Sequence, residues 1–361
     1  MQDIVAAALD RGDYRAAATL LQEWQKKSPK DPWLLLCVGR YQEAIGRWEA
    51  AEKTYLSLLR KATVPKLMTQ ARQGIQRVQT QRQQSREEAL ETARSVPGSN
   101  EPGFLCLEPV VPSEARTLAA QGLATVMRID PYMARLQLPS RGWRLYRVGP
   151  VGELQYFSRA LAEAGTPAFW VKQQDATGVQ VFNVEYFRSV GPTQATVVCR
   201  SAEGQLGTIV FEWHEVSQRV VGQLPLFESV VDVDEWKRLR RKQKTQDYAD
   251  IWDLHLHDRQ CMLRLCDRTY QFRQGNPLPD SEPVADHGTA TRPLWNALLT
   301  YIRTHTAGPQ HDGFAQFAEG AIDLIELMPP FAHQVRLPRL RESTWDPAFH
   351  LYSGLHFLRH R

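Results

Sequence analysis

Gly12-Asp13-Tyr14 and Gly46-Arg47-Trp48 are two copies of one short pattern, placed 34 residues apart, and they decide the fold of the first part of the chain. A glycine at the end of a helix lets the chain turn back. The aromatic residue then opens a second helix, and a small residue lets the two helices cross closely. The copies therefore predict consecutive helical hairpins. Three further pairs keep the offset: Ala17 with Ala51, Leu21 with Tyr55, and Trp24 with Leu58.

This period and pattern resemble the tetratricopeptide repeat (TPR) family over residues 1–65. Val38-Gly39 stands where the family has a Leu-Gly pair, and Pro29 stands where a repeat ends with proline. Thr63 replaces that proline in the second copy. Residues 66–93 continue as a polar helix without the pattern. The resemblance implies a groove that binds protein.

The resemblance also implies which residues line the groove, because the first helix of each hairpin faces it. Trp and Arg are frequent anchors at interfaces. A short array needs a partner surface, either elsewhere in the chain or on another protein. The alternative is a plain helical bundle that packs on the rest of the chain, with Trp33 in its core. The matching groove positions are Trp33, Leu36, Arg40 and Glu43, followed by Gln70 and Arg77.

Composition describes an ordinary globular chain of several domains. It has 361 residues, 43% of them apolar, and a net charge of +4. Its five cysteines include no Cys-x-x-Cys pair, which favours a reducing compartment. The N-terminus lacks the basic start and apolar centre of a secretory signal. No stretch reaches the roughly 18 apolar residues of a membrane span. We therefore expect a cytoplasmic protein.

The predicted fold class is multi-domain, with all-α TPR-like hairpins followed by α+β structure. In residues 104–175 the pattern predicts a ferredoxin-like βαββαβ unit, with Tyr132–Leu138 as its second strand. Within it, Tyr146-Arg-Val-Gly-Pro150 resembles the SPOR family of peptidoglycan-binding domains. Because no export signal precedes it, we carry over the fold and not the ligand. The predicted divisions are a helical domain at 1–93, a linker at 94–103, this unit, a β-rich domain at 176–310 and a helical, aromatic tail at 311–361.

The β-rich segment predicts seven short strands, the last at Thr269–Phe272, with helices at Glu235–Gln246 and Arg292–Thr304. This order fits a pleckstrin-homology-like (PH-like) barrel, and it also fits an open α+β sheet. In the tail, Phe314–Met328 predicts an apolar helix. The aromatic residues of Trp345–Arg361 are expected to pack back on the β-rich domain.

His255 and His257 are the one candidate for metal chemistry. They stand two residues apart on a predicted strand, so they share a face with Asp253 and together could hold a metal ion. No second motif supplies the remaining ligands. We therefore expect no metal, no cofactor and no enzymatic activity, with a metal-dependent hydrolase as the alternative.

A run of basic residues lies inside the predicted helix Glu235–Gln246. Such runs commonly form a solvated face. The alternatives are an anionic membrane surface, an acidic partner or RNA. No aromatic platform accompanies the run, so nucleic acid is not the expected partner. Its members are Lys237, Arg238, Arg240, Arg241, Lys242 and Lys244.

Taken together, these features predict a scaffold or assembly factor that recruits a protein partner through its TPR-like groove. The rival hypotheses are the hydrolase at His255 and His257 and a peripheral membrane or nucleic-acid binder using the basic run. The layout also resembles that of cyanobacterial TPR proteins that assist the assembly of photosynthetic complexes.

Overall fold

The computed structural model describes residues 1–111, 113–233, 239–275, 291–339 and 342–359. The chain forms two compact units, Met1–Thr92 and Ala93–Arg361. The first is helical and the second contains two sheets with helices, which confirms the coarse prediction of a multi-domain α then α+β protein. Each unit is described by itself below.

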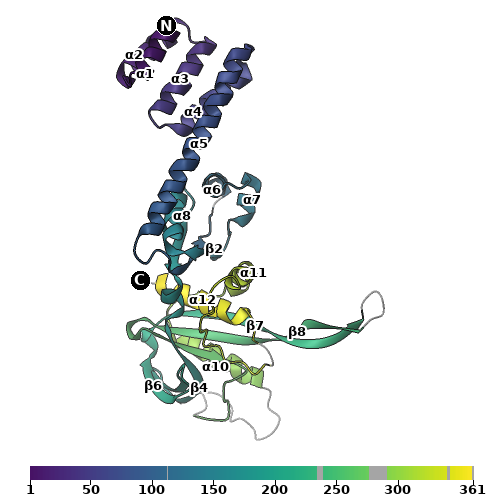
Figure 1. The fold of residues 1–361 in the computed structure, drawn as a ribbon. Coiled ribbons are helices and arrows are strands. Elements are labelled where there is room, and N and C mark those ends of the chain that lie inside the picture. The colour runs from purple at the N-terminus through teal and green to yellow at the C-terminus, as the bar shows by residue number, and fades with distance from the viewer. Residues whose placement is uncertain (112, 234–238, 276–290, 340–341, 360–361) are drawn as a thin grey trace. The chain divides into compact units, whose positions relative to one another are not determined.

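Unit 1 consists of antiparallel helical hairpins followed by a long helix (Figure 1). Gly12 and Gly46 end the first helix of each hairpin with φ angles of 73° and 75°, a left-handed conformation that favours glycine. Asp13 caps the next helix by accepting a hydrogen bond from the Ala16 amide at 3.0 Å. The helices are α1 (Gln2–Asp10), α2 (Tyr14–Lys27), α3 (Pro32–Ala44), α4 (Trp48–Lys61) and α5 (Pro65–Ser95), the last three residues of which belong to unit 2.

The core of unit 1 lies where the 34-residue offset places it. All six residues of the three matched pairs are buried. Five of them fall into two adjoining clusters, one with Leu21 and Trp24 and one with Ala51, Tyr55 and Leu58. Trp33 packs against both clusters, so α3 joins the first hairpin to the second.

Unit 2 begins with a three-stranded antiparallel sheet in the order β2-β1-β3. From its central strand Phe104 and Cys106 face the main core of the unit, and Leu145 and Phe169 join them from the outer strands. Gly103 faces the opposite way, toward Val151 and Leu154 of the helix on the other side. The elements are β1 (Pro102–Leu107), α6 (Ser113–Met127), α7 (Pro131–Gln137), β2 (Arg144–Pro150), α8 (Val151–Glu163), β3 (Ala168–Lys172) and α9 (Gln173–Thr177).

The predicted second strand of the ferredoxin-like unit is wrong, because Pro131–Gln137 is helix α7. Asp130 caps this helix by accepting from the Tyr132 amide at 2.8 Å, and Pro131 occupies its first position. An Asp N-cap followed by Pro is a strong start signal for a helix, and it outweighs the alternation of the side chains. The described sheet therefore has three strands in a β-α-α-β-α-β order.

A seven-stranded sheet follows, in the order β10-β7-β8-β9-β4-β5-β6. Neighbours are antiparallel, except that β4 runs parallel to β9 and β10 runs parallel to β7. The outer strands β10 and β6 do not pair with each other, so the described sheet is open rather than a PH-like barrel. The strands are β4 (Gln180–Val190), β5 (Gln194–Arg200), β6 (Leu206–Glu212), β7 (Val216–Val233), β8 (Leu239–Leu256), β9 (Cys261–Cys266) and β10 (Gln310–His311).

Helices cover both faces of this sheet. On one face α10 (Thr291–His305) packs Trp295 and Ile302 onto the strands. On the other face lie α11 (Phe314–Ile325) and α12 (Trp345–Arg359), which also reach the three-stranded sheet (Figure 1). One core thus collects residues from segments that the sequence analysis treats as separate domains. The expectation that the aromatic tail packs on the β-rich segment is confirmed.

Two further predictions of local structure are wrong. Part of the predicted helix Glu235–Gln246 is strand, because Leu239–Leu256 pairs with β7 along its length. Valine-rich residues in the facing strand favour that pairing over a helix. The predicted strand Thr269–Phe272 is a turn, in which the Tyr270 amide donates to the Cys266 carbonyl at 2.9 Å.

The predicted linker 94–103 is an ordered turn within unit 2. Ser99 is buried, and its carbonyl accepts from the Gly152 amide at 2.9 Å. The Glu101 carbonyl accepts from the Val151 amide at 2.9 Å. Gly152 leaves no room for a side chain, because an added Cβ would stand 2.3 Å from the Ala93 carbonyl oxygen. The turn is therefore fixed by close backbone contacts.

Candidate protein-binding surface

Helix α3 carries four of the six predicted groove residues, and its start is set by Asp31. One carboxylate oxygen of Asp31 accepts from the Trp33 amide at 2.9 Å and caps the helix. The other accepts from Nε1 of Trp24 at 3.2 Å. This single side chain fixes where Trp33 enters the helix and ties it to the preceding hairpin.

Helices α3 and α5 are held at a close distance by Tyr55, which lies between two glycines. An added Cβ on Gly39 would stand 2.4 Å from the Tyr55 ring, and one on Gly74 would stand 2.5 Å from its other side. Both distances are well inside van der Waals contact. The ring is 0% exposed, so it acts as a spacer that brings the two groove helices together. The predicted Val38-Gly39 pair is thus explained by the aromatic residue that it accommodates.

Glu43, Tyr55 and Arg77 form a polar group between α3, α4 and α5. The Tyr55 hydroxyl donates to Oε2 of Glu43 at 2.8 Å. Arg77 donates to both oxygens of Glu43, at 2.7 and 2.9 Å. Burial raises the pKa of Tyr55, and the hydrogen bond to Glu43 raises it further. The phenol therefore stays neutral and donates. Glu43 is engaged inside the protein and fixes the groove instead of offering a free carboxylate.

The remaining predicted groove residues differ in how available they are. Leu36 is 1% exposed in the core and cannot contact a partner, so it supports the surface from behind. Trp33 is half-buried, with the Lys66 amine 6.0 Å from its ring centre. Arg40 is exposed and has no side-chain hydrogen bond or ion pair within the described residues. Gln70 is half-buried, and its Oε1 has no hydrogen-bond partner there.

We define the α3–α5 face as Trp33, Arg40, Lys66, Gln70 and Arg77. Contacts from Lys66 to Trp33 and from Arg77 to Glu43 show that α3 and α5 meet along this face. Sequence reasoning missed Lys66, which comes just after Pro65 starts α5. It also missed the spacer role of Tyr55, although the 34-residue offset places this residue on the inward stripe.

His255, His257 and Asp253 do not converge on a shared site. Asp253 is bound by both arms of Arg264, at 2.8 and 2.7 Å, with both side chains buried. His257 follows the end of β8 and stacks on Phe357 at 4.1 Å between ring centres. No group of three or more His, Cys, Asp and Glu side chains in the described ranges is arranged to hold a metal ion.

His255 instead belongs to a buried hydrogen-bond network beneath α12. Gln218 Nε2 lies 2.9 Å from Nδ1 of His255, and an amide nitrogen only donates, so Nδ1 accepts. The other ring nitrogen then donates to Ser353 Oγ at 2.9 Å. Gln218 also donates to the His356 carbonyl at 2.8 Å, and its own oxygen accepts from His311 at 3.1 Å. The arrangement gives His255 a structural role.

Two histidines of α12 are kept neutral by burial. Burial lowers the pKa of His350 to about 3, and its Nε2 lies 2.8 Å from the Thr177 carbonyl oxygen. Burial lowers the pKa of His356 to about 2, and the nearby His311 lowers it further. The His356 ring stacks between those of Trp143 and His311, at 4.2 and 3.9 Å. These rings are packing elements of the core.

A polar cleft of about 410 Å³ opens between α10 and strands β7 and β8. Its two arginines are engaged within the protein: Arg292 pairs with Asp250 at 2.5 Å, and Arg303 lies 4.8 Å from the Trp252 ring centre. Burial raises the pKa of the neighbouring Asp267, and the Asp250 charge raises it further. Both arginines are thus engaged within the protein, and we assign the cleft no ligand.

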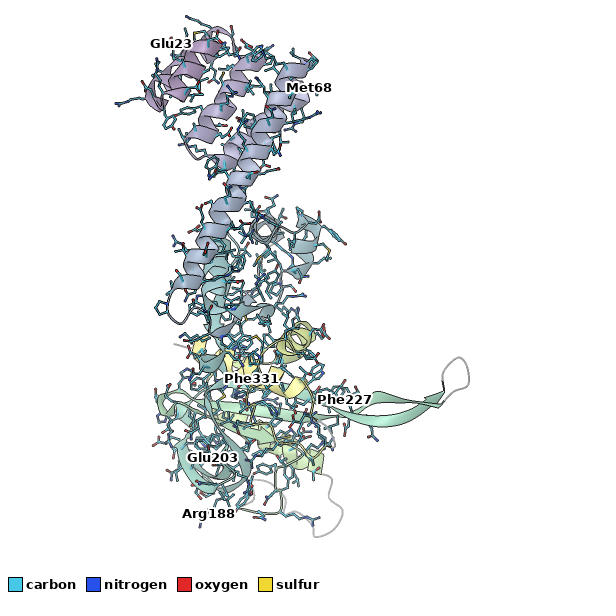
Figure 2. The ribbon with its side chains drawn as sticks, viewed as in Figure 1. Glu23, Met68, Arg188, Glu203, Phe227 and Phe331 are labelled. Carbon is cyan, nitrogen blue, oxygen red and sulfur yellow. The ribbon has the colours of Figure 1, made fainter. Side chains whose placement is uncertain are left out.

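The basic run lies in a hairpin arm, defined as residues 225–233 and 239–248, where β7 and β8 pair only with each other. Phe227 marks the base of the arm (Figure 2). Lys237 and Arg238 lie outside the described residues. The others follow along β8, where Lys244 stands opposite Glu228 and Arg240 stands opposite Asp232.

No protein-family model, curated protein or solved structure matches this chain. Among the described helices, none is long and apolar enough to cross a membrane.

Proposed function

We propose that this protein is a scaffold or assembly factor that recruits a polypeptide on its α3–α5 face. The observation that carries the proposal is a separation of roles on α3. Leu36 and Gly39 are buried, while Arg40 is exposed and Trp33, which packs on the core with one part of its ring, is only half-buried. Two TPR-like hairpins closed by α5 provide a rigid support for such a face. Exposed aromatic and arginine side chains on a rigid support are common anchors for a partner.

The charges of the face indicate what the partner presents. Arg40 is exposed without an internal partner among the described residues, and Lys66 lies above Trp33. Arg77 is already paired with Glu43. The surface therefore suits a segment that offers a carboxylate beside an apolar side chain, the first for Arg40 and Lys66 and the second for Trp33.

All five cysteines are free and buried, which supports placing this scaffold in a reducing compartment such as the cytoplasm. We propose no enzymatic activity for it. Under this proposal, the charged cleft of unit 2 and the hydrogen-bonded histidines beneath α12 have structural roles only.

The experiment starts with capture of partners from the host by the full-length chain, followed by titration of the purified partner. Trp33→Ala and Arg40→Ala should each raise the Kd about tenfold or more, as loss of an interface anchor does. Lys53→Ala and Arg60→Ala, which change exposed residues of α4, should leave the Kd unchanged. Circular dichroism confirms that all variants fold. The proposal would be contradicted if the α3 variants Trp33→Ala and Arg40→Ala bound the partner with the same Kd as the α4 control variants.

A further inference from the structure

Strand β6 ends the seven-stranded sheet, and no described strand pairs with its outer edge. It pairs with β5 without a bulge, from Gln194 opposite Glu212 to Arg200 opposite Leu206. Residues 206–211 read Leu-Gly-Thr-Ile-Val-Phe, with no charge and no proline. Native edge strands are usually protected from pairing with other chains by charged residues, by proline or by β-bulges. The β6 edge therefore has the features of a strand that pairs with another chain.

Two hydrogen bonds at the ends of β6 establish which backbone groups point outward. The Trp213 amide donates to the Thr193 carbonyl at 3.0 Å, and the Gln205 carbonyl accepts from the Ser201 amide at 2.9 Å. Odd-numbered residues thus direct their backbone groups to β5. Because the direction alternates along a strand, the amides and carbonyls of Leu206, Thr208 and Val210 point away from the sheet.

The same residues expose their side chains on one face of the sheet. Leu206 is 58% exposed and Val210 is 50% exposed, whereas Phe211 is buried in the core on the opposite face. Glu203, in the turn between β5 and β6, marks this region in Figure 2. The exposed edge is consequently flanked by two large apolar side chains, separated by Thr208.

We propose that the β6 edge pairs with the β6 edge of a second copy of this chain, antiparallel and about a two-fold axis at Thr208. In this register Thr208 faces its counterpart, and Leu206 faces Val210 of the second copy. All three residues have outward backbone groups, so each pair exchanges two hydrogen bonds. The register covers the exposed Leu and Val with each other, and such apolar cross-strand pairs stabilise a sheet.

Neighbouring registers are less complementary. A shift of one residue on each strand toward the C-terminal end places Glu212 opposite Leu206. The opposite shift places Leu206 opposite Thr208 and leaves Val210 without an apolar neighbour. The self-complementary pattern of Leu, Thr and Val therefore selects a second copy as the occupant and Thr208 as the centre.

Arg259 competes for one end of this edge. Its Nη1 donates to the Val210 carbonyl at 2.6 Å, and Glu215 holds its guanidinium at 2.6 Å. In the dimer that carbonyl accepts from the Leu206 amide of the second copy, so Arg259 must release it. Removing this side chain should favour the dimer.

Sedimentation equilibrium of the full-length protein over a range of concentrations tests the proposal. Wild type should show a monomer–dimer equilibrium. Thr208→Pro should weaken it about a hundredfold, because each copy loses a central donor and gains a steric block. This donor has no partner within the described sheet, so the variant keeps its fold. Arg259→Ala should strengthen dimerisation severalfold, and Glu203→Lys, outside the edge, should leave it unchanged.

Cysteine substitution tests the register, because the native cysteines are buried. Thr208→Cys should crosslink to itself under mild oxidation, since facing Cα atoms in such a pair lie about 5.5 Å apart. Val210→Cys should not, because it faces Leu206. Efficient crosslinking of Val210→Cys but not of Thr208→Cys would overturn the register. The proposal would be overturned if the wild-type protein stayed monomeric at every concentration. Binding of a different protein to the β6 edge, without dimerisation, would overturn it as well.

Discussion

The two units differ in how far apart in the sequence their stabilising contacts lie. In unit 1, Glu43 bonds to Tyr55 and Arg77, which are 12 and 34 residues away. In unit 2, Gln218 bonds to His356 across 138 residues, and His350 lies on Thr177 across 173. Unit 1 is thus stabilised by contacts between helices that are close in the sequence. In unit 2, the C-terminal helix α12 packs on strands that come much earlier in the chain.

This difference is compatible with the recognition role that we propose for unit 1. A stack of local hairpins needs few distant contacts, so one face of each helix can remain available to a partner. Unit 2 commits its polar side chains to internal pairs, including the buried histidines and the Asp253–Arg264 pair. The comparison yields four measurable expectations.

The largest effect is expected from Arg264→Met, which leaves the Asp253 carboxylate buried without its partner. The free energy of unfolding of unit 2 should fall by about 3–5 kcal/mol. Arg264 also donates to the His333 carbonyl at 2.7 Å, so the segment that follows α11 should loosen with it. Hydrogen exchange should show the loss across β8, β9 and α12 and leave α1–α4 unchanged.

The double variant Asp253→Leu with Arg264→Met provides the control for this expectation. Replacing both charges by apolar groups should recover most of the loss, because no charge remains buried. If the single variant destabilised unit 1 as much as unit 2, the units would not differ in the way described.

The second expectation is that acid destabilises unit 2 selectively. The folded state keeps His350 and His356 neutral, with pKa values of about 3 and about 2, whereas the unfolded chain protonates them below about pH 6.5. Their burial therefore carries no protonation penalty above pH 7, and stability falls as the pH drops through 6.5. Between pH 7 and pH 5 the loss is roughly 4 kcal/mol, about 2 kcal/mol for each histidine. Urea titrations at several pH values measure it.

His356→Phe keeps the stack on Trp143 and removes one titrating group, so the pH slope should fall by about a third to a half, because burial also lowers the pKa of His333. Unit 1 contains no histidine, so its own transition should lack this slope. An unchanged slope in the variant would refute the assignment.

The third expectation concerns the Tyr55 spacer. Gly39→Ala forces a methyl group against a ring that Gly74 confines on its other side. Overpacking of this kind costs about 1–3 kcal/mol. The loss should appear only in the unfolding transition of unit 1. Tyr55→Leu, which copies the residue at the matching position Leu21, should rescue Gly39→Ala. If Gly39→Ala alone were as stable as the wild type, α3 and α5 could move apart to accept the added methyl group, and Tyr55 would not fix their spacing.

The smallest effect is expected from the Glu43–Arg77 pair. Arg77 is about half exposed, so water screens the interaction, and a double-mutant cycle should give at most about 1 kcal/mol. The variants Glu43→Gln and Arg77→Gln, alone and combined, provide the cycle. A much larger coupling would mean that the groove depends on this pair instead of on Tyr55.

The sequence predicted the parts of the fold that rest on local signals. The glycines at positions 12 and 46 and the matched inward residues placed the helices of unit 1. Turn residues and alternation placed β4, β5, β6 and β9. The helix α7 was missed although its signal, Asp130-Pro131, is local, because the alternation of Tyr132–Leu138 was given more weight.

Other features had no local signal. The length of β8 depends on pairing with β7, and β10 is a two-residue strand defined only by its neighbour. In the candidate site, the TPR resemblance predicted Trp33, Arg40, Gln70 and Arg77 as groove residues. It did not show that Leu36 is buried or that Glu43 is engaged, because those facts depend on how Tyr55 fills the space between helices.

Helix α12 is synthesised after every strand that it covers. Until it leaves the ribosome, one face of the seven-stranded sheet lacks its cover, and Gly354 has not yet reached Ala176, against which it packs without room for a side chain. Unit 1 can be complete by then, because its contacts are local. The nascent chain therefore passes through a stage in which a finished unit 1 is joined to an uncovered apolar sheet face, a period in which chaperones are most needed.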